Sequence, residues 1–176
     1  MLHEEYAKAL FLLTEELGTS DAALADVSLC RDALFENSSY VRLTDSPAIP
    51  VSEKLTLIKE AFGTVREEVL NLLMILCERH SVHLFVAVAK HYNELYNESR
   101  GIIPAEIISA APLSEEQAKR LTERLEAVTG KKIILRCTTD KSLLGGARLR
   151  YSGIQLDGSL KARLDSIESG LKSSVI

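Results

Sequence analysis

The chain has 176 residues, of which 46% are hydrophobic and 26% charged, with a formal net charge of −4 and no tryptophan. This length suits one domain, or two small ones, with enough core to fold. The composition excludes disordered, collagen-like and low-complexity proteins. The longest purely apolar run, Leu72 to Cys77, is far shorter than the roughly 20 residues that a membrane span needs. The sequence therefore predicts a globular protein that does not cross a bilayer.

The cysteines and the first residues indicate the compartment. Cys30, Cys77 and Cys137 lie far apart and form no C-x-x-C pair, which is typical of reduced cysteines used as small hydrophobes. The opening MLHEEYAKAL is acidic and has a helical period, unlike a signal or transit peptide. We therefore expect the protein to stay where it is made, in a bacterial cytoplasm.

Charge is distributed unevenly along the chain. Residues 1–100 hold 9 basic and 16 acidic side chains, whereas residues 131–176 hold 9 basic and 4 acidic ones. Such a gradient predicts that the two parts have different neighbours.

Up to about residue 100, apolar side chains recur at helical spacing. A first helix is predicted from about Leu2 to Leu17, with Gly18 at its end and Ser20 or Asp21 capping the next. Prolines in TDSPAIP interrupt the pattern, and three more helices follow at about residues 52–62, 65–79 and 82–98. The predicted inward residues are Leu2, Tyr6, Leu10, Leu13 and Leu17 on the first helix, Leu24, Val27, Leu34 and Phe35 on the second, and Leu84, Phe85, Val88, Tyr92 and Leu95 on the last.

After Gly101 the period changes. Residues 102–110 and 132–138 alternate and are rich in β-branched side chains, so both are predicted strands. A helix between them begins at a capping box of Ser114 and Gln117, ends at Gly130, and turns Ala118, Leu121, Leu125 and Val128 inward. Two more strands, 144–151 and 154–156, flank a Ser152-Gly153 turn, and a last helix starts at Asp157-Gly158-Ser159.

These elements predict an α+β protein. Residues 1–100 form a helical bundle, and residues 101–176 form a small α/β domain with a β-hairpin. The boundary is expected near Arg100-Gly101.

No catalytic motif is present in the sequence. It contains no phosphate-binding loop, no G-x-G-x-x-G, no H-E-x-x-H and no G-x-S-x-G. Gly145 and Gly146 are the only glycine pair, and they are typical of a turn or bulge because glycine adopts backbone angles that other residues avoid. We therefore expect no enzyme activity and no cofactor.

Two other sets of residues are candidates for a zinc site and for acid–base catalysis. Cys77, His80 and His83 are spaced three apart and would need a further ligand to hold zinc; scattered surface histidines beside a buried cysteine are the simpler interpretation. Asp140 and Asp157 stand where turns and helix caps need them, and Asp165 lies on the outer face of the last helix.

The basic C-terminal part suggests a second hypothesis, a nucleic-acid-binding adaptor. Arg148 and Arg150 alternate along one strand, and Lys161 and Arg163 follow on the last predicted helix. Surface aromatics other than Tyr151 and the known RNA-binding motifs are missing from these strands. A solvated basic face, or one that docks an acidic protein, fits this pattern better.

Two predicted helices are apolar over an unusually wide arc. The first extends its stripe to Ala7, Ala9 and Phe11, and the helix predicted at about residues 65–79 reads VLNLLMILC over residues 69–77. A helix buried on one side needs only one stripe. These helices either lie at the centre of the bundle or flank a groove that accepts a partner's amphipathic helix.

Four segments resemble the delta subunit of the bacterial F-type ATP synthase, the counterpart of the mitochondrial oligomycin-sensitivity-conferring protein. The most specific is DKSLLGGARLRYSGIQLDGSLKARLDSI, Asp140 to Ile167. ISAAPLSEEQAKRL, Ile108 to Leu121, is a second match, and YAKALF and SPAIPVSEKL are weaker ones. In the first segment, Gly145, Gly146, Asp157, Gly158 and Ser159 fit the family's turns and helix start.

The resemblance implies a non-catalytic stator subunit with a bundle of six helices. In the family, the bundle receives the N-terminal helix of an alpha subunit between its first and fifth helices, and the C-terminal part contacts the end of the b-subunit stalk. One monomeric copy serves each complex, on the cytoplasmic side of the inner membrane and attached to it only through the complex, with no nucleic acid. Expected partner-binding residues are Tyr6, Ala9, Leu13, Met74, Ile75 and Glu78 for the alpha-subunit helix, and Lys161 and Arg163 for the stalk.

Overall fold

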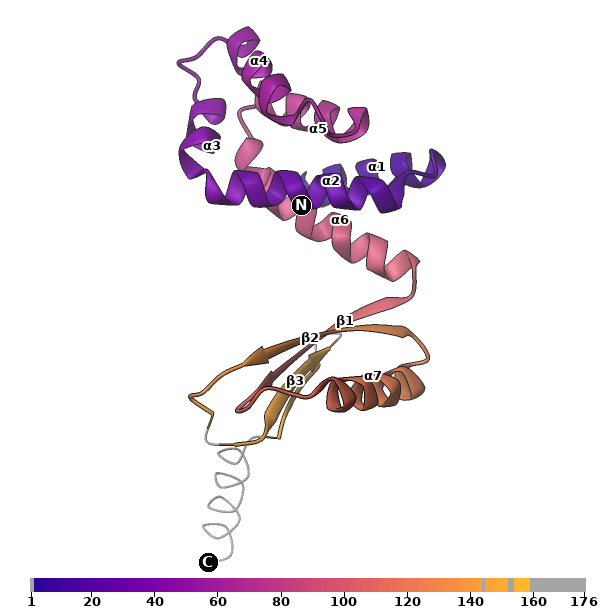
Figure 1. Ribbon diagram of the computed structural model, residues 1–176. Helices are drawn as coiled ribbons and strands as arrows, with labels where there is room; N and C mark the ends of the chain where they lie inside the picture. The colour runs from indigo at the N-terminus through magenta and orange to yellow at the C-terminus, as the bar shows by residue number, and fades with distance from the viewer. Residues whose placement is uncertain (1, 144, 152–153, 159–176) are drawn as a thin grey trace, which may run out of the picture. The chain divides into compact units, whose positions relative to one another are not determined.

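The computed structural model describes residues 2–143, 145–151 and 154–158. The chain divides into two compact units, Met1–Tyr96 and Asn97–Ile176, each described by itself below. The first unit is helical, and the second holds a four-stranded sheet with one helix (Figure 1). This confirms the predicted α+β class.

Six α-helices and a short 3-10 turn build the first unit. They are α1 (Leu2–Glu16), α2 (Ser20–Glu36), α3 (Ser38–Asp45), α4 (Val51–Phe62), α5 (Glu67–Glu78), η1 (Val82–Leu84) and α6 (Phe85–Ser99). The sequence periodicity did not predict α3, which has only eight residues. In the structure, Thr44 is the residue that this helix buries fully. The prediction for the second helix's cap was also wrong, since Thr19 takes the N-cap position and makes no side-chain bond there. None of the described helices has the length and apolar character that crossing a membrane requires.

Two helices of this unit end in the same local geometry. At the end of α1, Gly18 has φ +68°, and the Thr19 amide donates to the Thr14 carbonyl at 2.8 Å. At the end of α5, His80 has φ +54°, and the Ser81 amide donates to the Leu76 carbonyl at 2.8 Å. Both patterns satisfy the last carbonyls of a helix through a residue in the left-handed region, a position that usually favours glycine.

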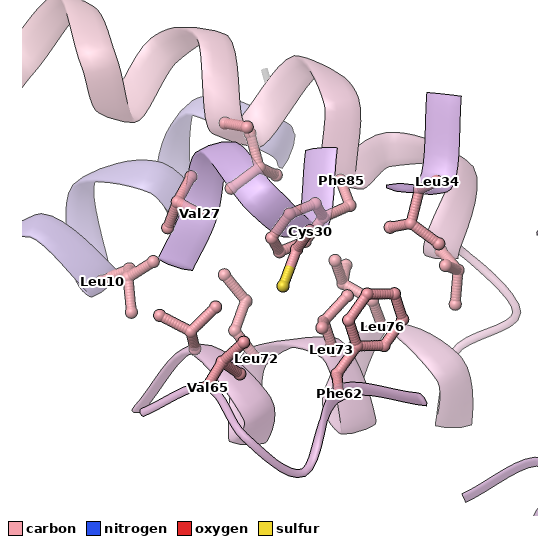
Figure 2. Close-up of a cluster of buried hydrophobic side chains, with 14 of the residues drawn as sticks. Leu10, Val27, Cys30, Leu34, Phe62, Val65, Leu72, Leu73, Leu76 and Phe85 are labelled. Carbon is pink, nitrogen blue, oxygen red and sulfur yellow. The ribbon is translucent and has the colours of Figure 1, made fainter. Parts of the chain in front are cut away.

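The core of the first unit lies where α2, α5 and α6 meet, with α1 and α4 at its sides. Figure 2 shows Val27, Cys30 and Leu34 of α2 facing Leu72, Leu73 and Leu76 of α5, with Phe85 of α6 among them. A Thr14 hydroxyl and the Tyr92 hydroxyl are 2.8 Å apart inside this core, and Tyr92 also donates to the Ser20 carbonyl at 3.3 Å. These two buried hydroxyls therefore have hydrogen-bond partners, as buried polar groups usually do.

The second unit contains β1 (Ile102–Ser109), α7 (Glu115–Thr129), β2 (Lys132–Thr139), β3 (Ala147–Tyr151) and β4 (Ile154–Asp157). The strand order is β2-β1-β3-β4; β1 runs parallel to β2 and antiparallel to β3. Ser114 and Gln117 form the predicted capping box, and Gly130 ends α7 with φ +67°. Leu121 and Leu125 of α7 pack on Ala105 and Ile133 of the sheet.

Beyond the first helix, two predicted inward side chains are exposed. Phe35, at the end of α2, is 75% exposed, and Val128, near the end of α7, is 81% exposed. Phe35 directly follows the buried Leu34 in the last turn of α2, so it points about 100° away from the buried face and was assigned to the wrong side. Val128 lies in the last turn of α7, one turn after the buried Leu125.

Candidate functional site

The orientation of α1 differs from the prediction. Its buried residues are Ala7, Leu10 and Thr14, whereas Leu2, Leu13 and Leu17, predicted inward, are exposed. The cause is the Thr14 hydroxyl, which donates to the Phe11 carbonyl at 3.0 Å and pairs with Tyr92. A threonine with its hydroxyl paired is easily buried, so Thr14 takes an inward position and Leu2 and Leu13 face outward, while Leu10 stays buried.

Helix α5 also carries an apolar side chain that the bundle does not cover. Its buried face holds Val69, Leu72, Leu73, Leu76 and Cys77. Ile75, on the opposite side, is 43% exposed. The width of the apolar arc on this helix thus has two causes, a broad core contact and one outward isoleucine.

Helices α1 and α5 are neighbours in the bundle. We call one set of exposed apolar side chains on these two helices the α1–α5 surface: Leu2, Ala9 and Leu13 on α1, and Ile75 on α5. Leu12 is also exposed but lies about 100° around α1 from Leu13, so it is not part of this set. Of the residues predicted to contact a partner, Ala9, Leu13, Ile75 and Glu78 are exposed. Tyr6 and Met74 are half-buried and pack against the core, so each offers a partner only part of its side chain.

Carboxylates border this surface. Glu5 and Glu16 on α1 and Glu67 and Glu78 on α5 are all exposed. An apolar centre with an acidic border suits an amphipathic helix whose flanks are basic.

The three candidate zinc ligands, Cys77, His80 and His83, each contact a different group. The Cys77 thiol faces the Thr44 carbonyl at 3.9 Å, His80 Nδ1 lies 2.8 Å from the ammonium of Lys54, and His83 Nδ1 lies 2.6 Å from the Asp45 carboxylate. Over the described part of the chain, no group of three histidine, cysteine or carboxylate side chains is placed to hold a metal ion.

These contacts instead hold a corner of the bundle together. Lys54 is fully buried and donates to the Ser46 carbonyl at 2.9 Å, so its ammonium joins the loop after α3 to the end of α5. Asp45 accepts from the amides of Val82 and His83 at 2.6 and 3.2 Å, which caps η1. His80 and His83 therefore have structural roles.

The cysteines differ in accessibility, which gives a direct check of the bundle. Burial raises the pKa of the Cys30 thiol to about 12, with a smaller contribution from Asp26, and burial also raises the pKa of Cys77. Cys137 is exposed. Because the thiolate is the reactive form, we expect Ellman's reagent at pH 8 to label one thiol quickly in the folded chain and all three after denaturation. A Cys137→Ser variant should show no fast thiol; a second fast thiol in the folded chain would contradict the packing around α2 and α5.

The turn residues of the second unit are partly described. Gly146 has φ +83°, and its carbonyl accepts from the Ala110 amide at 3.3 Å, in agreement with a turn before β3; Gly145 precedes it in this turn. Asp157 ends β4, and its carboxylate lies 3.0 Å from Arg148 Nε. The Gly158 amide donates to the Ala147 carbonyl at 2.9 Å, and a Cβ there would lie 3.3 Å from the same oxygen. Ser159, Lys161, Asp165, Arg163 and the predicted last helix lie outside the described residues.

The sequence reasoning missed one arrangement in the second unit. The side chains of Glu106 and Arg136 share one face of the sheet with Arg148 and Arg150. Only the strand register places Arg136 of β2, Glu106 of β1 and Arg150 of β3 in one row across the sheet. In the sequence, the alternation of Arg148 and Arg150 was the one visible sign of this face.

Together these features define a class of protein. Within the described residues there is neither a metal-binding cluster nor an arrangement of groups suited to catalysis, while an apolar helical surface and a charged sheet face are both open. Exposed surfaces of this kind are typical of proteins that bind other proteins.

Comparison with known proteins agrees with this class. The family model described as ATP synthase delta (OSCP) subunit matches residues 2–171. The ATP synthase subunit delta of Geobacillus sp. is 31% identical over 172 residues, covering 97% of both chains, and that of Chloroherpeton thalassium is 30% identical over 172 residues, covering 97% of this chain and 94% of the relative. A chain in the cryo-EM structure of the Toxoplasma gondii mitochondrial ATP synthase hexamer superposes with a TM-score of 0.73 at 26% identity, covering 97% of both chains.

The chain belongs to the ATP synthase delta (OSCP) subunit family. It is a structural, non-catalytic component of the peripheral stalk of the membrane-bound F-type ATP synthase. These relatives give no support to the nucleic-acid-binding alternative.

Proposed function

We propose that this subunit joins the peripheral stalk to the catalytic headpiece, so that the headpiece does not turn with the rotor. The helical unit receives the N-terminal helix of one alpha subunit on the α1–α5 surface. The second unit contacts the end of the b-subunit stalk. One monomeric copy acts in each complex, on the cytoplasmic side of a bacterial inner membrane and without nucleic acid.

The observation that carries this proposal is the exposed apolar face of α1. Leu2 and Leu13 point outward although the same helix has a separate buried face, and Ile75 is exposed on the neighbouring α5. Single exposed leucines are common on protein surfaces, but Leu2, Ala9 and Leu13 share one exposed side of α1, and an exposed apolar stripe that is separate from the buried face is typical of a docking surface. A partner helix with leucines at matching spacing would bury this line.

An apolar contact also suits the mechanical task. A stator carries torque continuously, so its contacts must persist under load and under changing ionic conditions. Affinity from buried apolar area depends little on salt. The acidic border formed by Glu5, Glu16, Glu67 and Glu78 then selects the orientation of a helix with basic flanks.

The stalk contact is proposed to be electrostatic. The last 46 residues, 131–176, hold 9 basic and 4 acidic side chains, which complements a charged helical stalk. Lys161 and Arg163 are the residues proposed to meet acidic groups of that stalk. The two contacts would thus differ in chemistry, with apolar area holding the headpiece and charge holding the stalk.

A tagged pull-down from detergent-solubilised membranes tests the proposal. The eluate is expected to contain the alpha, beta and b subunits and to show ATPase activity that the isolated chain lacks. The same purification from cells that express an untagged chain is the control. Recovery of nucleic acid or of unrelated soluble proteins in place of these subunits would contradict the stator role.

A further inference from the structure

The strand register of the second unit aligns charged side chains across the whole sheet. Residues paired across neighbouring strands project to the same face. One row therefore runs Arg136, Glu106, Arg150 and Gln155 from β2 to β4. The next row runs Thr138, Ile108, Arg148 and Asp157.

Helix α7 covers the opposite face. Leu121 and Leu125 of α7 pack on Ala105, Ile133 and other odd-numbered strand residues, whereas both charged rows consist of side chains that point away from this helix. Among the described elements, none covers the charged rows. We call this side the open sheet face: Lys132, Ile134 and Arg136 on β2, Pro104, Glu106 and Ile108 on β1, Arg148 and Arg150 on β3, and Gln155 and Asp157 on β4.

Cations are in excess on the open sheet face, and most of them are not neutralised. Arg148 pairs with Asp157 at 3.0 Å. Arg150 Nε donates to the neutral Gln155 side-chain oxygen at 3.1 Å, and Glu106, the cross-strand neighbour of both Arg150 and Arg136, is one carboxylate beside two arginines. Over the residues that the structure describes, no ion pair joins Lys132, Arg136 or Arg150 to a carboxylate.

An apolar strip lies beside these cations. Ile134 is 53% exposed, and its neighbour across the strands is the exposed Pro104. A surface with arginines along one line and an apolar strip along the next matches a helix that presents carboxylates and apolar side chains on adjacent stripes. Arginine suits this role because its guanidinium binds a carboxylate through two parallel hydrogen bonds.

We propose that the open sheet face is the docking site for an acidic amphipathic helix at the end of the peripheral stalk. This inference rests on the proposed stalk contact of the second unit and places that contact on the sheet. Arg136 and Arg150 bind carboxylates of the incoming helix. Ile134 and Pro104 cover its apolar stripe.

The test is binding of the full-length chain to the soluble part of the b subunits of the same ATP synthase. The double variant Arg136→Glu/Arg150→Glu is expected to lower affinity about tenfold at low salt, with a smaller difference at high salt. The matched control, Lys119→Glu/Arg124→Glu, makes the same change of charge at exposed positions of α7 and should alter affinity less than about twofold. Arg136→Gln/Arg150→Gln removes the charges without adding repulsion beside Glu106, so it tests the face even if the glutamate variant folds poorly.

The outcomes separate this inference from the function on which it rests. If the glutamine variant binds the b subunits as tightly as the unmodified chain, the open sheet face is not the docking site. If Lys161→Ala/Arg163→Ala then weakens binding in a salt-dependent manner, the stalk contact stands but lies on the C-terminal segment. If the unmodified chain fails to bind the b subunits, the stalk contact itself is wrong. Binding of RNA or DNA that requires Arg136 and Arg150 would overturn the inference in favour of a nucleic-acid surface.

Discussion

Replacing Ile75 or Leu13 by glutamate is expected to lower the affinity for the alpha-subunit N-terminal helix at least about tenfold while leaving the bundle folded. Both side chains are 43% exposed, so a carboxylate at either position remains hydrated in the free protein. On binding, the carboxylate would be buried against an apolar stripe with no partner, which is costly. Titration calorimetry with a synthetic peptide of that helix measures the change, and circular dichroism verifies the fold.

Val128→Glu is the matched control for this experiment. Val128 is 81% exposed on α7 of the second unit, so the same kind of substitution there should leave affinity for the alpha-subunit helix unchanged. Unchanged binding by both Ile75→Glu and Leu13→Glu would place the headpiece contact on another part of the bundle.

Phe85→Ala is expected to destabilise the helical unit by about 3–5 kcal/mol. Phe85 is fully buried at the start of α6, among side chains of α2 and α5 (Figure 2), and its removal leaves a cavity that surrounding residues fill only in part. Urea unfolding followed by helical circular dichroism measures the loss of stability.

The same substitution at Phe35 separates burial from residue type. Phe35 is 75% exposed at the end of α2, so Phe35→Ala should change the free energy of unfolding by no more than about 0.5 kcal/mol. Equal losses for the two variants would mean that the end of α2 is packed in solution or that the region around Phe85 is not.

The types of the helices and strands, and most of their ends, could be predicted because they depend on a few neighbouring residues in the sequence. Gly18 and Gly130 end α1 and α7 in the left-handed conformation, and Ser114 with Gln117 starts α7, because glycine conformation and capping are properties of a few neighbouring residues. The helix α3 escaped prediction because eight residues are only about two turns, too short a stretch for a period to stand out, and because it lies directly between Asn37 and the following prolines.

Which face of a helix is buried was harder to predict. On α1, the spacing of the apolar residues predicts that Leu13 faces the core. The structure instead buries Thr14, whose hydroxyl pairs with that of Tyr92, 78 residues away in the sequence. Such a pairing is invisible to any period within one helix. The open sheet face was missed for a similar reason, since the proximity of Arg136 to Glu106 and Arg150 depends on the register of three strands.

The functional class followed from motifs, and the periodicity alone left it open. DKSLLGGARLRYSGIQLDGS carries the family resemblance through turns and a hairpin, while a wide apolar helix is compatible with either a central core helix or a docking surface. The structure shows that α5 combines a broad buried face with an outward Ile75, so both interpretations describe part of that helix.

The connection between the two units has a mechanical consequence. Helix α6 is anchored in the bundle by Phe85, Val88 and Tyr92, and the chain that leaves it enters the sheet as β1, which lies between β2 and β3. The chain thus enters the smaller unit through a strand that is hydrogen-bonded on both edges. A force directed along β1, in the proposed stator role, would load those bonds together in shear instead of opening them one after another, as at a peeled edge strand.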